Sequence, residues 1–119
     1  MGAQSFGASA RLHARAEFLE VQNTGRRATA RFLTLLGKPN TKGRDRLGII
    51  ASRRVGGAVA RNRAKRRLRE VFRRQAAGSA VLGHPMDLVV IAKAAIVEAP
   101  FGALTEDFQS ALRKLRGAR

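Results

Sequence analysis

The strongest constraint on the fold is a stretch in which dense positive charge and a regular apolar stripe share the same residues. Between Arg53 and Arg74 the chain carries ten Lys or Arg side chains and a single acid, Glu70. At about 100° per residue, the apolar side chains of this stretch fall within one arc of about 120°. They are Ala60, Ala64, Leu68, Val71 and Phe72. We therefore predict a helix over residues 56–77, ended by Gly78, with its apolar face on a core and its cationic face in solvent.

The charge of the whole chain indicates a polyanionic partner. The sequence contains 24 Lys or Arg and 8 Asp or Glu, a formal net charge of +16. Nineteen of the cations are arginines, whose planar guanidinium group matches phosphates and guanine edges. An anionic membrane surface is the competing target, but the chain has no Trp and no Tyr to anchor an interfacial helix. Nucleic acid is the favoured partner, and no membrane contact is expected.

Length and composition favour one globular domain. A hydrophobic content of 45% is enough for a core, and 119 residues suit a single domain. Residues 1–10 are small and polar, so we predict a flexible N-terminal lead followed by one domain over residues 11–119. The absence of Cys excludes disulfides and thiolate metal sites, and no apolar run approaches the length of a membrane span. These features are typical of a soluble, cytoplasmic protein.

The N-terminal half outside the basic stretch reads as one helix and at least two strands. A helix is predicted from Arg11 to a stop at Asn23 and Gly25, with an apolar face formed by Leu12, Phe18 and Val21. Residues 26–37 read as a strand that is apolar on both sides. Residues 46–52 read as the next strand of a hairpin across a turn at 37–45, and the region leaves room for another short strand.

The C-terminal part adds a strand and a helix. Residues 87–92 form a continuous apolar run, which suits a strand covered on both faces. After Pro100 a helix is predicted, with Glu106 and Asp107 in its first turn, where negative charge suits the helix dipole. Its apolar stripe is Leu104, Phe108, Ala111, Leu112 and Leu115. The order helix, strand, strand, helix, strand, helix predicts an α/β sandwich with one sheet.

The cationic face of the 56–77 helix is the candidate functional surface. A run of charge is usually a solvated face, but solvated faces intersperse the two signs and this one hardly does. Like charges three or four residues apart destabilise a helix by a few tenths of a kcal/mol per pair, as at Arg63 and Arg66. A phosphate-rich partner would cancel that repulsion and release counterions. Asn62, between two arginines, can both donate to and accept from RNA.

A resemblance to a known family is carried by RLGI at residues 46–49 and ASRRVGGAVARNRAKRRLRE at 51–70. This block closely resembles the signature of the bacterial ribonuclease P protein subunit. Arg61, Asn62 and Arg63 match the family's arginine–asparagine–arginine motif, and Lys65, Arg66 and Arg69 follow at its spacing. The similarity continues in RL at 11–12, EF at 17–18, Phe32 and DLVVIA at 87–92. It therefore spans nearly the whole chain, from residue 11 to about residue 115.

The resemblance implies both a fold and an activity. The implied fold is an α+β two-layer sandwich of order αβββαβα, with one mixed sheet and a left-handed βαβ crossover through the basic helix. The implied partners are the catalytic ribonuclease P RNA and precursor tRNA. The implied activity is endonucleolytic hydrolysis that removes the 5′ leader of precursor tRNA, with catalysis by the RNA and its Mg²⁺. No organic cofactor and no obligate protein partner are expected.

Two sets of site residues follow from the resemblance. The catalytic-RNA surface would consist of Ser52, Arg53, Arg54, Arg61, Asn62, Arg63, Lys65, Arg66 and Arg69. A cleft between the first helix and the sheet would hold the leader, lined by Phe18, Gln22, Phe32, Leu33 and Leu35. Gln22 and Leu35 stand where the family often has aromatic residues, so this cleft should depend more on aliphatic contacts and Arg. A core position is the alternative for both phenylalanines, and for Phe32 it is the favoured one.

The sequence offers no grouping of residues suited to protein-borne hydrolysis. Such chemistry needs clustered carboxylates holding metals or an acid–base pair. The eight acids are scattered, and His13 and His84 have no companion at metal-ligand spacing. We therefore expect no catalytic and no metal-binding residues in the chain. Two alternatives remain: a ribosomal or general RNA-binding protein, and a major-groove DNA reader, which the strands on either side of the basic helix disfavour.

Overall fold

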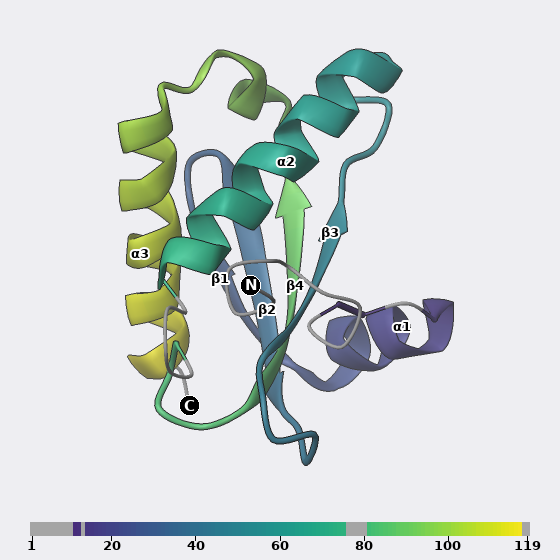
Figure 1. The fold of residues 1–119 in the computed structure, drawn as a ribbon, viewed down its shortest axis with the longest axis vertical. Helices are drawn as coiled ribbons and strands as arrows, with labels where there is room; N and C mark the ends of the chain where they lie inside the picture. The colour runs from purple at the N-terminus through teal and green to yellow at the C-terminus, as the bar shows by residue number, and fades with distance from the viewer. Residues whose placement is uncertain (1–10, 13, 76–80, 118–119) are drawn as a thin grey trace, which may run out of the picture.

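The computed structural model describes residues 11–12, 14–75 and 81–117. In chain order its elements are α1 (Arg15–Thr24), β1 (Arg26–Thr29), β2 (Leu33–Pro39), β3 (Arg46–Ile50), α2 (Ala58–Gln75), β4 (Met86–Ala92), the 3₁₀ helix η3 (Ala94–Glu98) and α3 (Phe101–Gly117) (Figure 1). The predicted flexible lead at 1–10 and the predicted helix end at Gly78 lie outside the described residues. The order αβββαβα is confirmed, with η3 as an addition.

The four strands form one mixed sheet in the order β1-β2-β4-β3. β2 pairs antiparallel with both β1 and β4, whereas β3 pairs parallel with β4. In Figure 1, α2 lies in front of the sheet and the parallel strands β3 and β4 run upward. The chain leaves β3, crosses the front of the sheet through α2 and enters β4, which lies to the left of β3. The crossover is therefore left-handed, against the strong general preference for right-handed ones.

The predicted hairpin between residues 26–37 and 46–52 is wrong. β4 lies between β2 and β3, and the hairpin is formed by β1 and β2 within the stretch read as one strand. A side chain from α3 stabilises the turn between them. The Asp107 carboxylate accepts hydrogen bonds from the backbone N–H groups of Arg31, at 3.0 Å, and Phe32, at 2.8 Å. Asp107 lies in the second turn of α3 and not in the first, as predicted, because the helix begins at Phe101.

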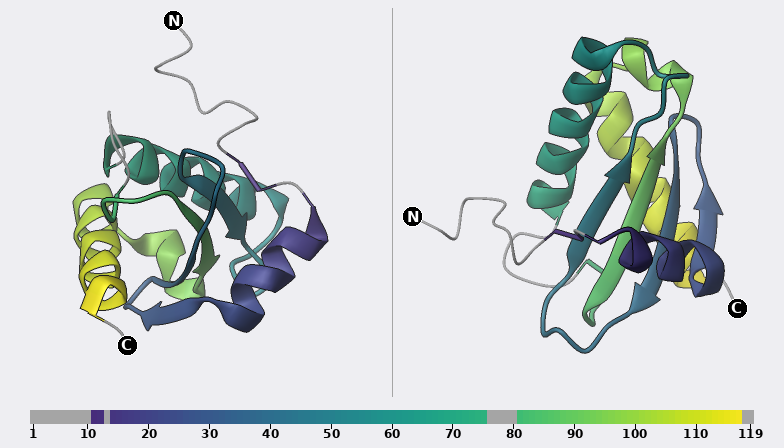
Figure 2. Two further views of the ribbon diagram at one scale, coloured as in Figure 1. Left: turned by 90° about the horizontal axis from the view of Figure 1, so that it is seen from below. Right: turned by 90° about the vertical axis from the view of Figure 1, so that its right-hand side faces the viewer.

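The helices cover both faces of the sheet. α2 and α3 pack on one face over the larger core, which includes Leu33, Leu35, Leu68, Leu88 and Phe108. α1 lies on the opposite face over a smaller core of Leu12, Val21, Leu36 and Val89 (Figure 2). β4 contributes to both cores, so the prediction of a strand covered on both faces is confirmed.

The first helix begins later than predicted. Leu12 is extended beside β3, and its backbone N–H donates to the Leu47 carbonyl at 3.0 Å. Glu17 stabilises the start of α1 because its side chain accepts from the Ala14 N–H at 3.2 Å. Leu12 thus reaches the smaller core from a strand position and not from a helix face.

Helices α2 and α3 bury the predicted stripes. In α2 the side chains of Ala64, Leu68, Val71 and Phe72 are buried, whereas Ala60 of the predicted stripe is half-buried. All five predicted residues of α3 are buried. Before α2 the chain turns at Gly56, whose φ of +143° is a conformation that side chains with a Cβ rarely adopt. Within the described residues, no helix is both long enough and apolar enough to span a membrane.

Candidate nucleic-acid interface

The nine residues predicted to face the catalytic RNA lie in the turn before α2 and in its first three turns. Ser52, Arg53 and Arg54 are exposed in that turn. On α2, Asn62, Arg63 and Arg66 are exposed, whereas Arg61, Lys65 and Arg69 are half-buried on its flanks. None of the nine is buried, so the helix presents a continuous polar surface, called the α2 surface below.

Charge on α2 is compensated only near its C-terminal end. The Glu70 carboxylate accepts hydrogen bonds from Arg73, at 2.6 Å, and from Arg74, at 2.7 Å. These bonds, that of Arg73 first, lower the pKa of Glu70 to about 2. Because Glu70 is the only acid of α2, the first three turns keep their full positive charge. The uncompensated charge is thereby concentrated on the α2 surface.

One flank of α2 meets α1 at the outer edge of β3. Lys65 and Arg69 line a small cavity of about 110 Å³ together with Arg11, Leu12, Phe18, Leu47, Gly48 and Ile49. Burial, and next the positive charge of Arg11, lower the pKa of Arg69. The α2 surface is therefore continuous, around the β3 edge, with the face of the sheet that carries α1.

The opposite flank of α2 contacts η3 through Arg67, a role that sequence reasoning missed. The Arg67 guanidinium donates to the Ile96 carbonyl at 3.1 Å and also to the Ala99 carbonyl. Burial, and next the charge of Arg63, lower its pKa. In the sequence Arg67 cannot be distinguished from the other arginines of the basic run, because its two acceptor carbonyls lie about thirty residues away.

Phe18 and Gln22, predicted for the leader cleft, lie on the α1 side of the sheet. Both are half-buried, and Phe18 packs on the smaller core together with the half-buried Ile50 and Ile91. A Cβ at Gly48 would lie 2.5 Å from two atoms of the Phe18 ring, so the ring rests directly on the backbone of β3. We call the surface formed by Phe18, Gln22, Ile50 and Ile91 the α1 face.

The prediction is wrong for the other three cleft residues, which do not lie on the α1 side of the sheet. Leu33 and Leu35 are fully buried and Phe32 is 7% exposed, and all three belong to the core beneath α2 and α3. Since strand side chains alternate, Leu36 is the β2 leucine that faces α1. Residues 32–36 give no alternating pattern, so only the pairing with β1 and β4 sets which leucines face which helix. The core alternative for Phe32 is confirmed, and Ile50 and Ile91 were missed.

Most carboxylates of the chain have structural partners. Arg46 binds Asp87 through two hydrogen bonds of 2.8 Å and Glu17 through one of 3.0 Å. Asp45 accepts from the backbone N–H groups of Val81 and Met86, each at 2.9 Å. Among residues 11–12, 14–75 and 81–117, no three His, Asp or Glu side chains lie close enough to hold one metal ion. That the chain supplies no catalytic group stays a prediction.

Comparison with known proteins identifies relatives over nearly the whole chain. The profile of the ribonuclease P family matches residues 6–116. The ribonuclease P protein component of Gluconacetobacter diazotrophicus is 39% identical, over 91% of this chain and 94% of that protein. That of Chloroflexus aggregans is also 39% identical, over 87% of this chain and 76% of that protein.

A solved structure agrees with these sequence relatives. The ribonuclease P protein from Thermotoga maritima superposes with a TM-score of 0.75 and 29% identity, covering 92% of this chain and 97% of that one. The fold that this chain shares with it is the α+β fold described above, a mixed four-stranded sheet with three helices. With the arginine-rich α2 surface and near full-length sequence matches, this chain belongs to the ribonuclease P protein component family.

Proposed function

We propose that this chain is the protein subunit of ribonuclease P and that it binds the catalytic RNA through the α2 surface. The observation that carries the proposal is the uncompensated positive charge of residues 61–69, on a helix whose apolar stripe holds it against the sheet. Arg63 and Arg66 are exposed, three residues apart, and repel one another until a polyanion binds. A folded RNA supplies that charge at matching density.

The α1 face is the proposed site of the 5′ leader of precursor tRNA. It combines a half-buried Phe18 ring with two isoleucines, and it offers Gln22 as a polar partner for bases. A single strand can lie on such a surface by stacking and apolar contact, without sequence-specific pairing. Because the α1 face adjoins the α2 surface at the β3 edge, one protein can contact leader and catalytic RNA together.

In the proposed reaction the protein positions RNA, and the RNA hydrolyses the phosphodiester that joins leader to tRNA. Mg²⁺ would be held mainly by the RNA, since six of the chain's eight carboxylates are engaged with its own cations or amides. The cations of α2 would screen the phosphates brought together there, which favours metal binding by the RNA at low Mg²⁺. We place this activity in the cytoplasm, with no organic cofactor, no membrane and no obligate protein partner.

The decisive experiment is 5′-leader cleavage by a matching catalytic RNA at low Mg²⁺, with and without this chain. We expect the chain to restore cleavage that the RNA alone supports only at higher Mg²⁺. The chain alone, freed of nucleic acid, should leave precursor tRNA intact. Absence of stimulation, together with co-sedimentation with ribosomes and equal binding of precursor and mature tRNA, would instead identify a general RNA-binding protein.

A further inference from the structure

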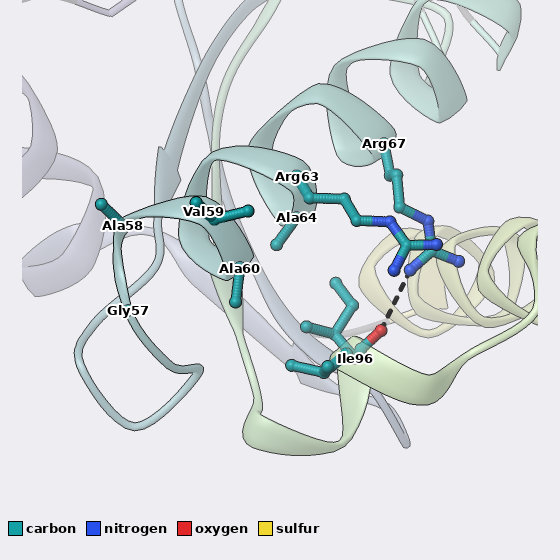
Figure 3. A pocket seen from close by; sticks show the side chains of 9 residues that line it. Gly57, Ala58, Val59, Ala60, Arg63, Ala64, Arg67 and Ile96 are labelled. Atoms are coloured by element: carbon teal, nitrogen blue, oxygen red, sulfur yellow. Dashed lines mark hydrogen bonds between the residues drawn. The ribbon is translucent and has the colours of Figure 1, made fainter.

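A pocket of about 490 Å³ lies between the N-terminal half of α2 and η3, on the flank of α2 away from α1 (Figure 3). Apart from two arginines, it is lined by glycine, alanine, valine and isoleucine residues. Val59 and Ala60 line it from α2, and Ile96 and Val97 line it from η3. None of the residues used so far to describe RNA binding, except Arg63, lines this pocket.

The pocket carries two of the three exposed large apolar side chains among the described residues. Val59 is 83% exposed and Val97 is 39% exposed, and the third, Leu19, lies on α1. An exposed valine on a helix whose neighbouring surface positions are Asn and Arg gains nothing from packing within the chain. Two such side chains at one hollow mark a surface that an apolar or aromatic group can cover.

The rim of the pocket is cationic. Figure 3 shows the guanidinium groups of Arg63 and Arg67 on the same side of the pocket, and Arg67 is held by its hydrogen bond to the Ile96 carbonyl. The two lie close enough for the charge of Arg63 to lower the pKa of Arg67. No carboxylate lines the pocket; Glu98, next to Val97 in the chain, lines a neighbouring hollow.

We propose that this pocket holds one unpaired nucleobase of an RNA that lies along the α2 surface. The apolar walls would cover the faces of the base, and the guanidinium planes at the rim would stack on it or bind its phosphate. A nucleotide unites a flat apolar group with a negative charge, which matches apolar walls beneath a cationic rim. The pocket opens beside Arg63, so an RNA bound as proposed above passes its mouth. The inference therefore rests on the proposed binding of RNA to the α2 surface.

A direct test is an NMR titration that follows the methyl groups of Val59 and Val97. The probes are adenosine 5′-monophosphate and uridine 5′-monophosphate, with ribose 5-phosphate as the probe that lacks a base. We expect both nucleotides to shift the two valine methyl signals through the ring current of the base. Ribose 5-phosphate should leave them unchanged, and the Leu19 methyls serve as the internal control because Leu19 is 41% exposed on α1.

Equal shifts with ribose 5-phosphate would overturn the proposal, because the pocket would then bind phosphate alone. It would also be overturned if an acidic peptide shifted the methyls and the nucleotides did not, which would identify a protein partner. The titration needs no catalytic RNA, so its result is independent of leader cleavage. Stimulated cleavage without methyl shifts removes this inference and leaves the proposed function standing.

A paired variant tests the same pocket in RNA binding. Val59→Ser combined with Val97→Ser removes the apolar walls at two exposed positions, and Leu19→Ser is the matched control. On a single-stranded oligonucleotide we expect the double variant to lose at least about fivefold in affinity, with an unchanged dependence on salt, because no phosphate contact is removed. An equal loss in Leu19→Ser, or a reduced salt dependence in the double variant, would contradict the proposal. Thermal unfolding shows that each variant is folded.

Discussion

Gly48 decides how deeply Phe18 lies on the sheet. Any Cβ at position 48 would approach the ring to 2.5 Å and the Leu12 side chain to 3.2 Å. The ring cannot retreat freely, because α1 is packed over the smaller core. The absence of a side chain at Gly48 therefore lets the Phe18 ring lie directly on β3. This position of the ring shapes the α1 face, the surface that we propose for the leader.

Gly48→Ala should destabilise the protein by about 1–3 kcal/mol, the usual cost of adding a methyl group to a packed contact. The measurement is urea unfolding. Gly102→Ala is the control, since a Cβ there meets nothing within 4 Å and alanine suits the helix better. We expect Gly102→Ala to be neutral or slightly stabilising. If both variants lose the same stability, the close approach at Gly48 is not the reason.

At the scale of the element, α2 combines two tasks in one helix. Its buried stripe fixes it to the sheet. The Glu70 carboxylate offsets one of the two positive charges in the last turn, and the first three turns stay charged. Arg67 adds a lateral tie to η3. The helix therefore presents charge in a defined place and orientation, which a flexible basic tail would not do.

Arg66→Ala should reduce the salt dependence of RNA binding by about one phosphate contact, a change of roughly 0.7–0.9 in the slope of log affinity against log salt. The measurement is binding of the catalytic RNA at several salt concentrations. Arg27→Ala is the control, because Arg27 is exposed on β1 at the opposite edge of the sheet from β3. It removes the same charge and should leave the slope nearly unchanged. A slope that stays constant in Arg66→Ala excludes a direct phosphate contact.

The ion pairs of Glu70 should make stability depend on acid pH. The pKa of Glu70 is about 2 in the folded chain and near 4.5 without its partners, so folding favours the ionised form. Its contribution is complete above about pH 4.5, declines as the pH falls and is lost below about pH 2. The difference in unfolding free energy between wild type and Glu70→Gln should therefore be constant near neutral pH and shrink in this window. Urea unfolding across that range measures it, and a difference independent of pH would disprove the assignment.

At the scale of the whole molecule, the two surfaces that we propose for RNA, the α2 surface and the α1 face, lie around one edge of the sheet. β3 is that edge, and its residues line the small cavity between Phe18 of α1 and Arg69 of α2. The left-handed crossover places α2 on the face away from α1, with β3 between them (Figure 2). In the proposed complex, a strand that leaves the catalytic RNA would pass around the β3 edge to the α1 face.

Phe18→Ala should weaken binding of precursor tRNA by at least about fivefold and leave mature tRNA nearly unaffected, since only the precursor carries a leader that could stack on the ring. Leu19→Ala is the matched control from the same helix, because Leu19 is exposed and does not belong to the smaller core. Binding of both tRNAs by the holoenzyme is the measurement. Equal losses for precursor and mature tRNA would show that Phe18 serves only the core.

Helices α2 and α3 and the family could be predicted from the sequence alone, because their signals are local. The apolar stripes of α2 and α3 recur every three or four residues, so a window of a few helical turns is enough to detect them. The block around Asn62 is likewise contiguous in the sequence. The surface position of the arginines follows from the same pattern, since a face so rich in charge has no favourable place in a core.

Strand pairing and the composition of the sites were decided only by the tertiary structure. Leu33 and Leu35 face α2 and α3, whereas Leu36 faces α1, and the adjacent Leu35 and Leu36 look alike in the sequence. β4 lies between β2 and β3 in the sheet, although about forty residues separate it from them in the chain. The pocket beside Arg67 forms because η3, which follows β4, lies against one flank of α2. These arrangements depend on contacts between segments far apart in the chain, whose free energy is gained only when the whole sheet forms, so no local pattern records them.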